Sequence, residues 1–356
     1  MGAGEQIRQV VIRGPGQIEV TEVNAPQAGR GEVRVRPLLV GVCGSDLHVL
    51  AGKHPFVSYP VMPGHEVVGI VDAVGLDVPD IEVGRRVLVE PNLVCGECRY
   101  CRSGRYNLCD QLTVVGFQSP GSLADLFTIP ASRLHPVPPS LSDQEAALVE
   151  PLSTATHAVR IVGTDLTGRT VAILGAGSIG LLTLVAAREA GAAAIVVTDL
   201  QESKLERAVR LGALGGFDAR DERVVQRIKD ALDGRPDVIF DCVSNQSSID
   251  QAVALANKGG TVIVVGVATG PVKIPLPIIQ DQEIRIEGSA MYTGQDVRRA
   301  MEILDAGALP IDEIVTATYP LEEIERAFAA AYSGDEVKVH VRVSAQSPSS
   351  TSVKTS

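Results

Sequence analysis

The sequence predicts an α/β protein in which an all-β part precedes a parallel sheet with helices on both faces. Three observations support this prediction. The first 151 residues are rich in Val, Gly and Pro, and turn residues separate their short β-branched runs. From residue 152 onward, apolar strand patterns alternate with helical patterns, which is typical of a parallel sheet. A glycine-rich turn joins the first of these strands to the helical pattern that follows.

The expected elements divide the chain into three segments and a tail. In the first part, strands are expected at 33–36, 67–74 and 86–89. The second part should run strand 170–174, helix 181–190, strand 194–198, helix 202–211, helix 223–232, strand 237–240, helix 247–255 and strand 261–265. Helices at 296–306 and 321–331 and a strand at 338–342 should rejoin the first domain. The domains are therefore placed at residues 1–151, 152–288 and 289–344, and the polar, low-complexity residues 345–356 are expected to be disordered.

Composition excludes several classes of protein. The 356 residues are 45% hydrophobic and 21% charged, which is typical of globular material with room for two domains. The net charge is −11 and no Lys/Arg cluster occurs, so we expect no nucleic-acid partner. No apolar run is long enough to span a membrane, and the N-terminus lacks a signal-peptide pattern, so we expect a cytoplasmic protein.

The glycine-rich turn follows a strand pattern and opens a helical one, as in a dinucleotide-binding loop. Its glycines allow a tight turn, close approach of a pyrophosphate, and close packing of helix on strand. The helix N-terminus also attracts phosphate groups. A flexible glycine turn without a ligand is the alternative interpretation. The loop residues assigned to the cofactor are Gly175, Gly177, Ser178, Ile179 and Gly180.

Asp199 ends the next predicted strand, at the place where an acid meets the adenosine ribose hydroxyls of a bound dinucleotide. Because an acid repels the 2′-phosphate of NADP, the sequence favours NAD. Lys204 lies nearby and keeps NADP open. Val265 and Gly266, at the end of a later strand, are assigned to the cofactor site as well.

Four cysteines, Cys95, Cys98, Cys101 and Cys109, lie within fifteen residues. Thiolates this close repel one another unless a cation binds them, and four thiolates make a closed tetrahedral zinc site. Disulfides are the first alternative, but a reducing compartment disfavours them. An iron–sulfur cluster is the second, and the nearby features of a catalytic zinc site argue against it. The sequence therefore predicts a structural zinc lobe at residues 95–109.

A second set of potential ligands comprises Cys43 and the adjacent pair His65-Glu66. One thiolate, one imidazole and a carboxylate form an open zinc site, where the metal keeps a position for water or substrate. Taken alone, Cys43 could be a small buried apolar residue, and His65 an ordinary hydrogen-bonded histidine. Ser45 and Asp46 stand close by in sequence and would add a hydroxyl and a supporting carboxylate.

The order and spacing of five stretches resemble the zinc-dependent medium-chain dehydrogenases/reductases over nearly the whole chain. These stretches are GVCGSDLH (41–48), PGHEVVG (63–69), CGECRYCRSGRYNLC (95–109), LVEPLSTATHAV (148–159) and VAILGAGSIG (171–180). The resemblance implies a GroES-like β catalytic domain, a Rossmann coenzyme domain with a doubly wound parallel sheet, and an active-site cleft between them.

Within that family, Glu150 is informative because the horse-liver type of alcohol dehydrogenase has a cysteine ligand there. A glutamate resembles the sorbitol, butanediol and threonine dehydrogenase branch. The resemblance then implies that Cys43, His65 and Glu66 hold the catalytic zinc, with Glu150 as an exchangeable fourth ligand or water partner. Asp46 would orient His65. The catalytic residues so implied are Ser45, His48, Glu66 and Glu150.

The resemblance predicts an NAD-dependent enzyme with two zinc ions per subunit that interconverts a secondary alcohol or polyol and its ketone. A homodimer or homotetramer is expected. Val49 and Met291 replace a tyrosine and an arginine that line the pocket of sorbitol-type enzymes, so we expect a preference for less polar secondary alcohols. Two alternatives are a zinc-free enone or quinone reductase and a non-catalytic NAD- or zinc-binding protein of the same fold.

Overall fold

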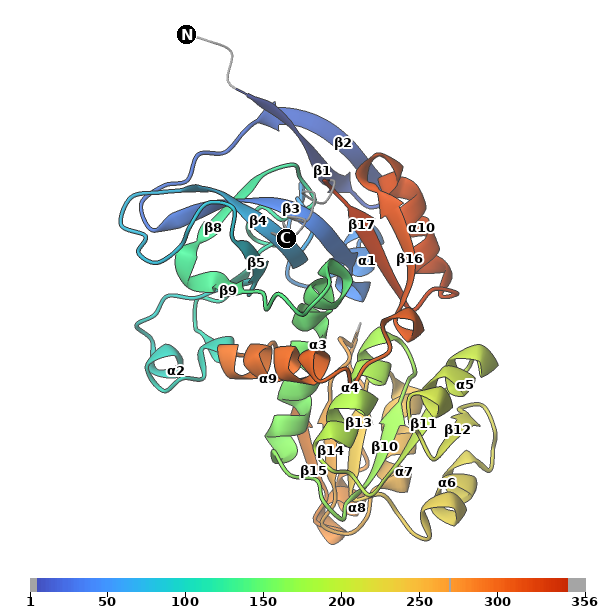
Figure 1. Ribbon diagram of the computed structural model, residues 1–356. Coiled ribbons are helices and arrows are strands. Elements are labelled where there is room, and N and C mark those ends of the chain that lie inside the picture. Colours follow the sequence, from blue (N-terminus) through green and yellow to red (C-terminus); the bar gives the residue numbers. More distant parts are fainter. Residues whose placement is uncertain (1–4, 269, 345–356) are drawn as a thin grey trace, which may run out of the picture.

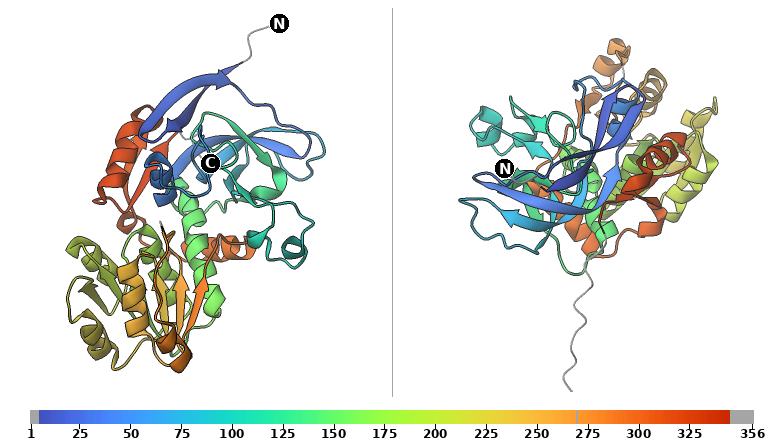
Figure 2. Two further views of the ribbon diagram at one scale, coloured as in Figure 1. Left: turned by 180° about the vertical axis from the view of Figure 1, so that it is seen from behind. Right: turned by 90° about the horizontal axis from the view of Figure 1, so that it is seen from above.

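A computed structural model describes residues 5–268 and 270–344, so the predicted disordered tail at 345–356 lies outside the described residues. Figure 1 shows a β-rich body above and a parallel-sheet body below, with the long helix α3 (Asp143–Val162) between them. The view from behind shows the same division (Figure 2). Within the described ranges, no helix has both the length and the apolar character needed to span a membrane.

The β-rich body is built on a seven-stranded sheet in the order β16-β17-β3-β4-β5-β9, with β8 paired to β3. β17, the last strand among the described residues, pairs antiparallel with β3, so the C-terminal segment does return to the first part. The strands are β3 (Glu32–Val42), β4 (Glu66–Val74), β5 (Arg86–Val89), β8 (Phe127–Pro130), β9 (Leu134–Pro136), β16 (Val315–Pro320) and β17 (Lys338–Arg342). Two small pairs, β1 (Gln6–Gly14) with β2 (Gln17–Asn24) and β6 (Asn92–Leu93) with β7 (Thr113–Val114), lie outside this sheet.

The second body contains a six-stranded, wholly parallel sheet in the order β12-β11-β10-β13-β14-β15. The first strand therefore lies in the middle, and successive strands are added on either side, which is the doubly wound arrangement predicted. Ligands bind such sheets in the crevice beside the reversal of strand order, here between β10 and β13. The elements are β10 (Thr170–Leu174), α4 (Ser178–Glu189), β11 (Ala194–Asp199), α5 (Glu202–Arg210), β12 (Gly215–Asp218), α6 (Val224–Leu232), β13 (Val238–Asp241), α7 (Gln246–Leu255), β14 (Thr261–Val264), α8 (Leu276–Asp281) and β15 (Arg285–Gly288).

Helix α3 was not predicted, and it runs through the domain boundary placed at residues 151 and 152. Its start is marked in the sequence by a capping box, in which the side chains of Ser142 and Glu145 accept hydrogen bonds from each other's backbone N–H groups. Pro151 inside the helix and its Ser/Thr-rich continuation hid the helical pattern. The exact domain boundaries stay a prediction. At residues 151 and 152 a continuous helix, rather than a linker, joins the two parts of the chain.

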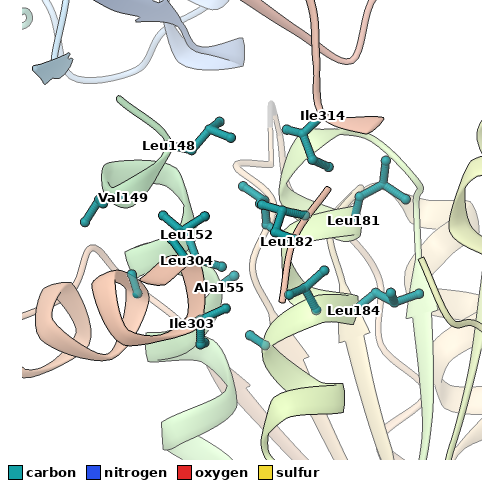
Figure 3. Close-up of a cluster of buried hydrophobic side chains, with 14 of the residues drawn as sticks. Leu148, Val149, Leu152, Ala155, Leu181, Leu182, Leu184, Ile303, Leu304 and Ile314 are labelled. Carbon is teal, nitrogen blue, oxygen red and sulfur yellow. The ribbon is translucent and has the colours of Figure 1, made fainter. Parts of the chain in front are cut away.

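The largest apolar core gathers around α3 and reaches into both bodies. Figure 3 shows Leu152 of α3 beside Leu182 of α4 and Leu304 of α9 (Gly294–Asp305). Leu39 and Val68 of the β-rich sheet belong to the same cluster. Because interiors of this density move as packed units, α3 fixes the position of its own polar side chains relative to both sheets.

Two strands of the parallel sheet were also missed. β12 holds consecutive glycines, which disfavour a strand in sequence patterns. Gly216 is needed there because a Cβ would lie 2.7 Å from Cβ of Leu205 on α5. β15 is a short edge strand with only one apolar side chain among four residues. Both strands depend on tertiary packing rather than on local preference.

Candidate metal and cofactor sites

The four-cysteine lobe folds as predicted. Cys95, Cys98, Cys101 and Cys109 place their sulfur atoms within 4.8 Å of one another, and none forms a disulfide. Backbone N–H groups donate to three of these sulfurs at 3.3–3.4 Å, including Cys98 N to Cys95 Sγ. N–H groups aimed at sulfur favour the thiolate form, and four thiolates in one cluster require a cation. The donor set therefore fits a structural zinc ion.

The second ligand set is also assembled. Ligand atoms of Cys43, His65 and Glu66 lie within 4.8 Å of one another. Cys43 is the N-cap of α1 (Gly44–Leu50), whereas His65 and Glu66 enter at the start of β4. Burial opposes a charge on His65, yet Asp46 and Cys43 hold its pKa well above the usual value. The groups around His65 thus favour positive charge at this point, and the residues fit a bound cation.

Glu66 makes an ion pair that sequence reasoning missed. Lys338 Nζ donates to both Glu66 oxygens, at 2.7 and 2.9 Å, and both side chains are buried. The strand register explains how they meet, because Glu66 of β4 lies opposite Gly41 of β3, which lies opposite His340 of β17. A Cβ on Gly41 would lie 1.9 Å from Glu66 Oε2, so only glycine lets the carboxylate cross β3 to reach Lys338.

Asp46 lies behind His65 as the sequence implied, but at a longer distance than a hydrogen bond. Asp46 Oδ1 is 3.7 Å from His65 Nδ1, and neither atom has a hydrogen-bond partner among the described residues although both are buried. The other Asp46 oxygen accepts from Cys43 N at 3.0 Å. A shift of a few tenths of an ångström would complete the Asp46–His65 bond, and orphaned buried polar atoms here are costly without it.

Glu150 lies in the middle of α3, buried, with Tyr292 donating its hydroxyl to Oε1 at 2.7 Å. Burial and the nearby Glu66 raise the pKa of Glu150 to about 7, although His65 opposes this rise. Glu150 is therefore close enough to His65 and Glu66 for their charges to act on it. It does not belong to the compact ligand set of Cys43, His65 and Glu66.

Ser45 and His48 both lie on α1, one helical turn apart and half-buried, so they share one face of the helix. Sequence reasoning assigned no partner to His54, which stacks on Phe117 with ring centroids 4.7 Å apart. Phe117 in turn packs against His65 at 4.9 Å. Phe117, which the sequence patterns missed, therefore lies between the partly exposed His54 and the metal ligand His65.

Val49 does not line this site. Its side chain is fully buried in the apolar core of the β-rich body, together with Val10 and Ile12. The expectation that Val49 makes the pocket apolar is therefore wrong, because residue spacing on a short helix cannot tell a pocket face from a core face. Met291 is half-buried, in a left-handed conformation with φ 50°.

The glycine loop has the geometry that a dinucleotide needs. Gly175 takes φ 94°, and a Cβ on Gly180 would lie 1.8 Å from the Gly175 carbonyl oxygen, so α4 packs tightly on β10. Gly177 is the N-cap of α4, and a Cβ there would meet nothing within 4 Å. That open space before a twelve-residue helix fits a pyrophosphate. Ser178 and Ile179 form the first turn of this helix.

Asp199 ends β11 beside the loop. One oxygen accepts from Ala176 N at 2.7 Å, and the other accepts from Leu200 N and Gln201 N. These bonds fix the carboxylate at the rim of the crevice, where it would meet a ribose. Lys204 lies in the first turn of α5, and Val265 and Gly266 follow β14 directly. A Cβ on Gly266 would lie 2.9 Å from Ser244 Oγ.

A GroES-like β domain, a doubly wound parallel sheet and two zinc-ligand sets together define a zinc-binding dehydrogenase. The alcohol dehydrogenase GroES-like domain family matches residues 29–139, and the zinc-binding dehydrogenase family matches residues 178–306. The sorbitol dehydrogenase of Bacillus subtilis is 33% identical over 334 residues, which cover 92% of this chain and 94% of that protein.

Solved structures agree over almost the whole length. A Sinorhizobium meliloti 1021 protein bound to NADP has a TM-score of 0.88 at 34% identity, covering 95% of this chain and 100% of that one. The 2R,3R-butanediol dehydrogenase of Bacillus subtilis has a TM-score of 0.88 at 28% identity, with coverage of 95% and 100%. The chain belongs to the zinc-dependent medium-chain dehydrogenase/reductase family, in its sorbitol and butanediol dehydrogenase branch.

We predict two zinc ions per subunit in protein purified without added metal or chelator, as measured by elemental analysis. Cys43→Ser should lose one ion and abolish dehydrogenase activity while leaving the fold intact, because only an open site carries the chemistry. Cys98→Ser should lose the other and mainly lower stability. Cys242→Ser, a thiol outside both clusters, is the control and should keep both ions. One zinc ion or none in the wild-type protein would contradict the two-site assignment.

Lys338→Met should lower the free energy of unfolding by about 3–5 kcal/mol, because it leaves the Glu66 carboxylate buried without its partner. The measurement is urea unfolding of the purified protein. Arg342→Met makes a similar change at the exposed end of the same strand and should alter stability by no more than about 0.5 kcal/mol. Equal losses in the two variants would show that the buried pair contributes no more than a surface charge.

Proposed function

We propose that the protein is an NAD-dependent dehydrogenase that oxidises a secondary alcohol or polyol to its ketone at the Cys43–His65–Glu66 site. The observation that supports this most strongly is that both ligand sets and the glycine loop are preassembled in one chain. The complete set of Cys43, His65 and Glu66 argues against a zinc-free reductase. The homodimeric or homotetrameric state and the cytoplasmic location predicted from the sequence belong to this proposal.

Cys43, His65 and Glu66 would hold the catalytic metal, and Glu150 would be an exchangeable fourth ligand or would bind a water molecule beside it. Zinc supplies a Lewis acid that lowers the pKa of an alcohol hydroxyl, and NAD supplies the hydride acceptor. Asp46 would orient the His65 ring from behind. Lys338 holds the Glu66 carboxylate at the edge of the ligand set.

The proton of the alcohol hydroxyl needs a path to water, and α1 offers one. Ser45 and His48 share a face of this helix, so the Ser45 hydroxyl would accept the proton while giving its own proton to His48, which would pass it outward. The hydride leaves the carbon to which that hydroxyl is attached. The glycine loop and Asp199 would hold the cofactor so that its nicotinamide faces this carbon.

The alcohol itself is defined by class only. Two relatives are named for sorbitol and 2R,3R-butanediol, which both carry neighbouring hydroxyl groups, and this supports a polyol or diol as substrate. Tyr292 and Glu150 offer a hydroxyl and a carboxylate in the site, so the wall there is polar. Because Val49 lies in the apolar core and not in the wall of the site, we do not propose that the enzyme prefers apolar alcohols.

The test is NADH formation, followed by absorbance, over a panel of sorbitol, xylitol, 2,3-butanediol and an aryl secondary alcohol. At least one member should be oxidised, and treatment with a chelator should abolish the reaction because the open site loses its metal. Cys43→Ser should be inactive on the whole panel. A metal-loaded protein that binds NAD but oxidises no alcohol would support the non-catalytic alternative.

Asp199→Ser should lower kcat/KM for NAD, because a contact with the ribose is lost. It should also narrow the difference in kcat/KM between NAD and NADP, because the charge that repels the 2′-phosphate is removed. The measurement is kcat/KM with each cofactor at saturating alcohol. Glu206→Ser removes an exposed acid further along α5 and should leave the cofactor ratio unchanged. Equal efficiency of the wild-type enzyme with NAD and NADP would overturn this assignment.

A further inference from the structure

Residues 290–294 carry Tyr292 to the active site and lead from irregular backbone into α9, which begins at Gly294. Three hydrogen bonds attach its backbone to the β-rich body. Asn107 Nδ2 donates to the Ala290 carbonyl at 3.0 Å, Asn92 Nδ2 donates to the Tyr292 carbonyl at 2.8 Å, and Gly294 N donates to the Tyr106 hydroxyl. Residues 290, 292 and 294 are thus each bonded to the β-rich body.

Two of these three partners belong to the zinc lobe. Tyr106 and Asn107 form the short 3-10 helix η1 (Tyr106–Leu108), which ends at the ligand Cys109. Cys109 N donates to the Tyr106 carbonyl at 3.0 Å, so the turn that presents the fourth thiolate also presents these two side chains. Asn92 lies on β6, just before the lobe.

At the other end of this connection, the Tyr292 hydroxyl donates to Glu150. Tyr292 is 1% exposed, and it follows Met291, whose φ of 50° is unfavourable for a non-glycine residue. Such a conformation persists only where the surroundings enforce it. Asp296 of α9 caps Thr293, and the three hydrogen bonds to residues 290, 292 and 294 hold the segment to the β-rich body on both sides of Met291.

We propose that Tyr106 and Asn107 of the four-cysteine lobe are positioning residues for the active site. They hold residues 290–294 so that the Tyr292 hydroxyl bonds Glu150 and fixes its carboxylate. The lobe then has a second role besides stabilising its own loop, because closing it around a metal sets the place of an active-site side chain. This inference rests on the proposed function only in assigning Glu150 to the active site.

The variant Tyr106→Phe removes the acceptor for Gly294 N and keeps the ring. Tyr100→Phe makes the same change in α2 (Arg99–Arg102) of the same lobe, and the Tyr100 hydroxyl bonds Arg99 rather than the segment. Tyr106→Phe should lower kcat about fivefold, the size of one hydrogen bond, with an unchanged KM for NAD. In a Tyr292→Phe background the same change should cost less than about twofold, since neighbouring residues that act through one contact are not additive. Tyr100→Phe should change neither value.

A second measurement does not depend on enzyme activity. The chain has six tyrosines, so fluorotyrosine labelling gives a short fluorine NMR spectrum in which Tyr292→Phe identifies the Tyr292 signal. Tyr106→Phe should shift or broaden that signal, whereas Tyr100→Phe should not. The signal of Tyr332, which is 66% exposed, is the internal reference. If Tyr106→Phe does not fold, Asn107→Ser removes the lobe's donor to the Ala290 carbonyl and gives the same two measurements.

The outcomes separate this inference from the proposed function. An unmoved Tyr292 signal in Tyr106→Phe would overturn the inference, as would an equal loss of kcat with and without the Tyr292 hydroxyl. Failure of the wild-type protein to oxidise any alcohol would overturn the proposed function. In that case the fluorine spectra still decide whether the lobe positions Tyr292.

Discussion

The architecture of the β-rich body depends on one buried ion pair, between Glu66 and Lys338. A carboxylate with no exposed surface is costly unless an opposite charge and hydrogen bonds compensate it. Lys338 supplies both, and it lies on the last strand of the chain, 272 residues away in sequence. The pair therefore requires β17 to lie beside β3, and it requires glycine at position 41 between the two side chains. The returning C-terminal segment, held to β3 by backbone pairing and by buried valines, thus brings an ammonium group to the metal site.

The same pair shapes the electrostatics of the candidate site. Asp46, Glu66 and Glu150 are buried acidic groups close to Cys43 and His65. Burial lowers the pKa of His65, but Asp46, Cys43 and Glu150 hold it well above its usual value. His340 next to Lys338 behaves oppositely, because burial lowers its pKa to about 4 and leaves a neutral ring. A cation at Cys43 and His65 is what this distribution of charge lacks.

Local sequence signals predicted what local chemistry determines, namely the glycine loop, the four-cysteine lobe and most strands of the parallel sheet. The bounds of β5, β10 and β17 match the prediction because short apolar runs end there at turn residues or charges. Lys338, Tyr292 and Phe117 complete the site across long sequence separations, which no local pattern encodes. In Lys338-Val-His-Val the polar side chains alternate with valines, which is the ordinary pattern of a half-exposed strand. The structure buries both faces of β17, so the burial of Lys338 and His340 comes from tertiary packing.

Helix α3 connects the metal ligands of the β-rich body with the glycine loop of the parallel-sheet body. Its first half carries Glu150 to the metal ligands, and its apolar residues pack on α4, whose N-terminus is the glycine loop. Further along, His157 and Arg160 bind Asp296 of α9, with Arg160 Nε at 2.6 Å, and burial cannot offset the lowering of the Asp296 pKa by these partners. The cofactor loop, the Glu150 carboxylate and the segment that carries Tyr292 are thus all attached to α3. A displacement of α3 would therefore change the positions of all three together.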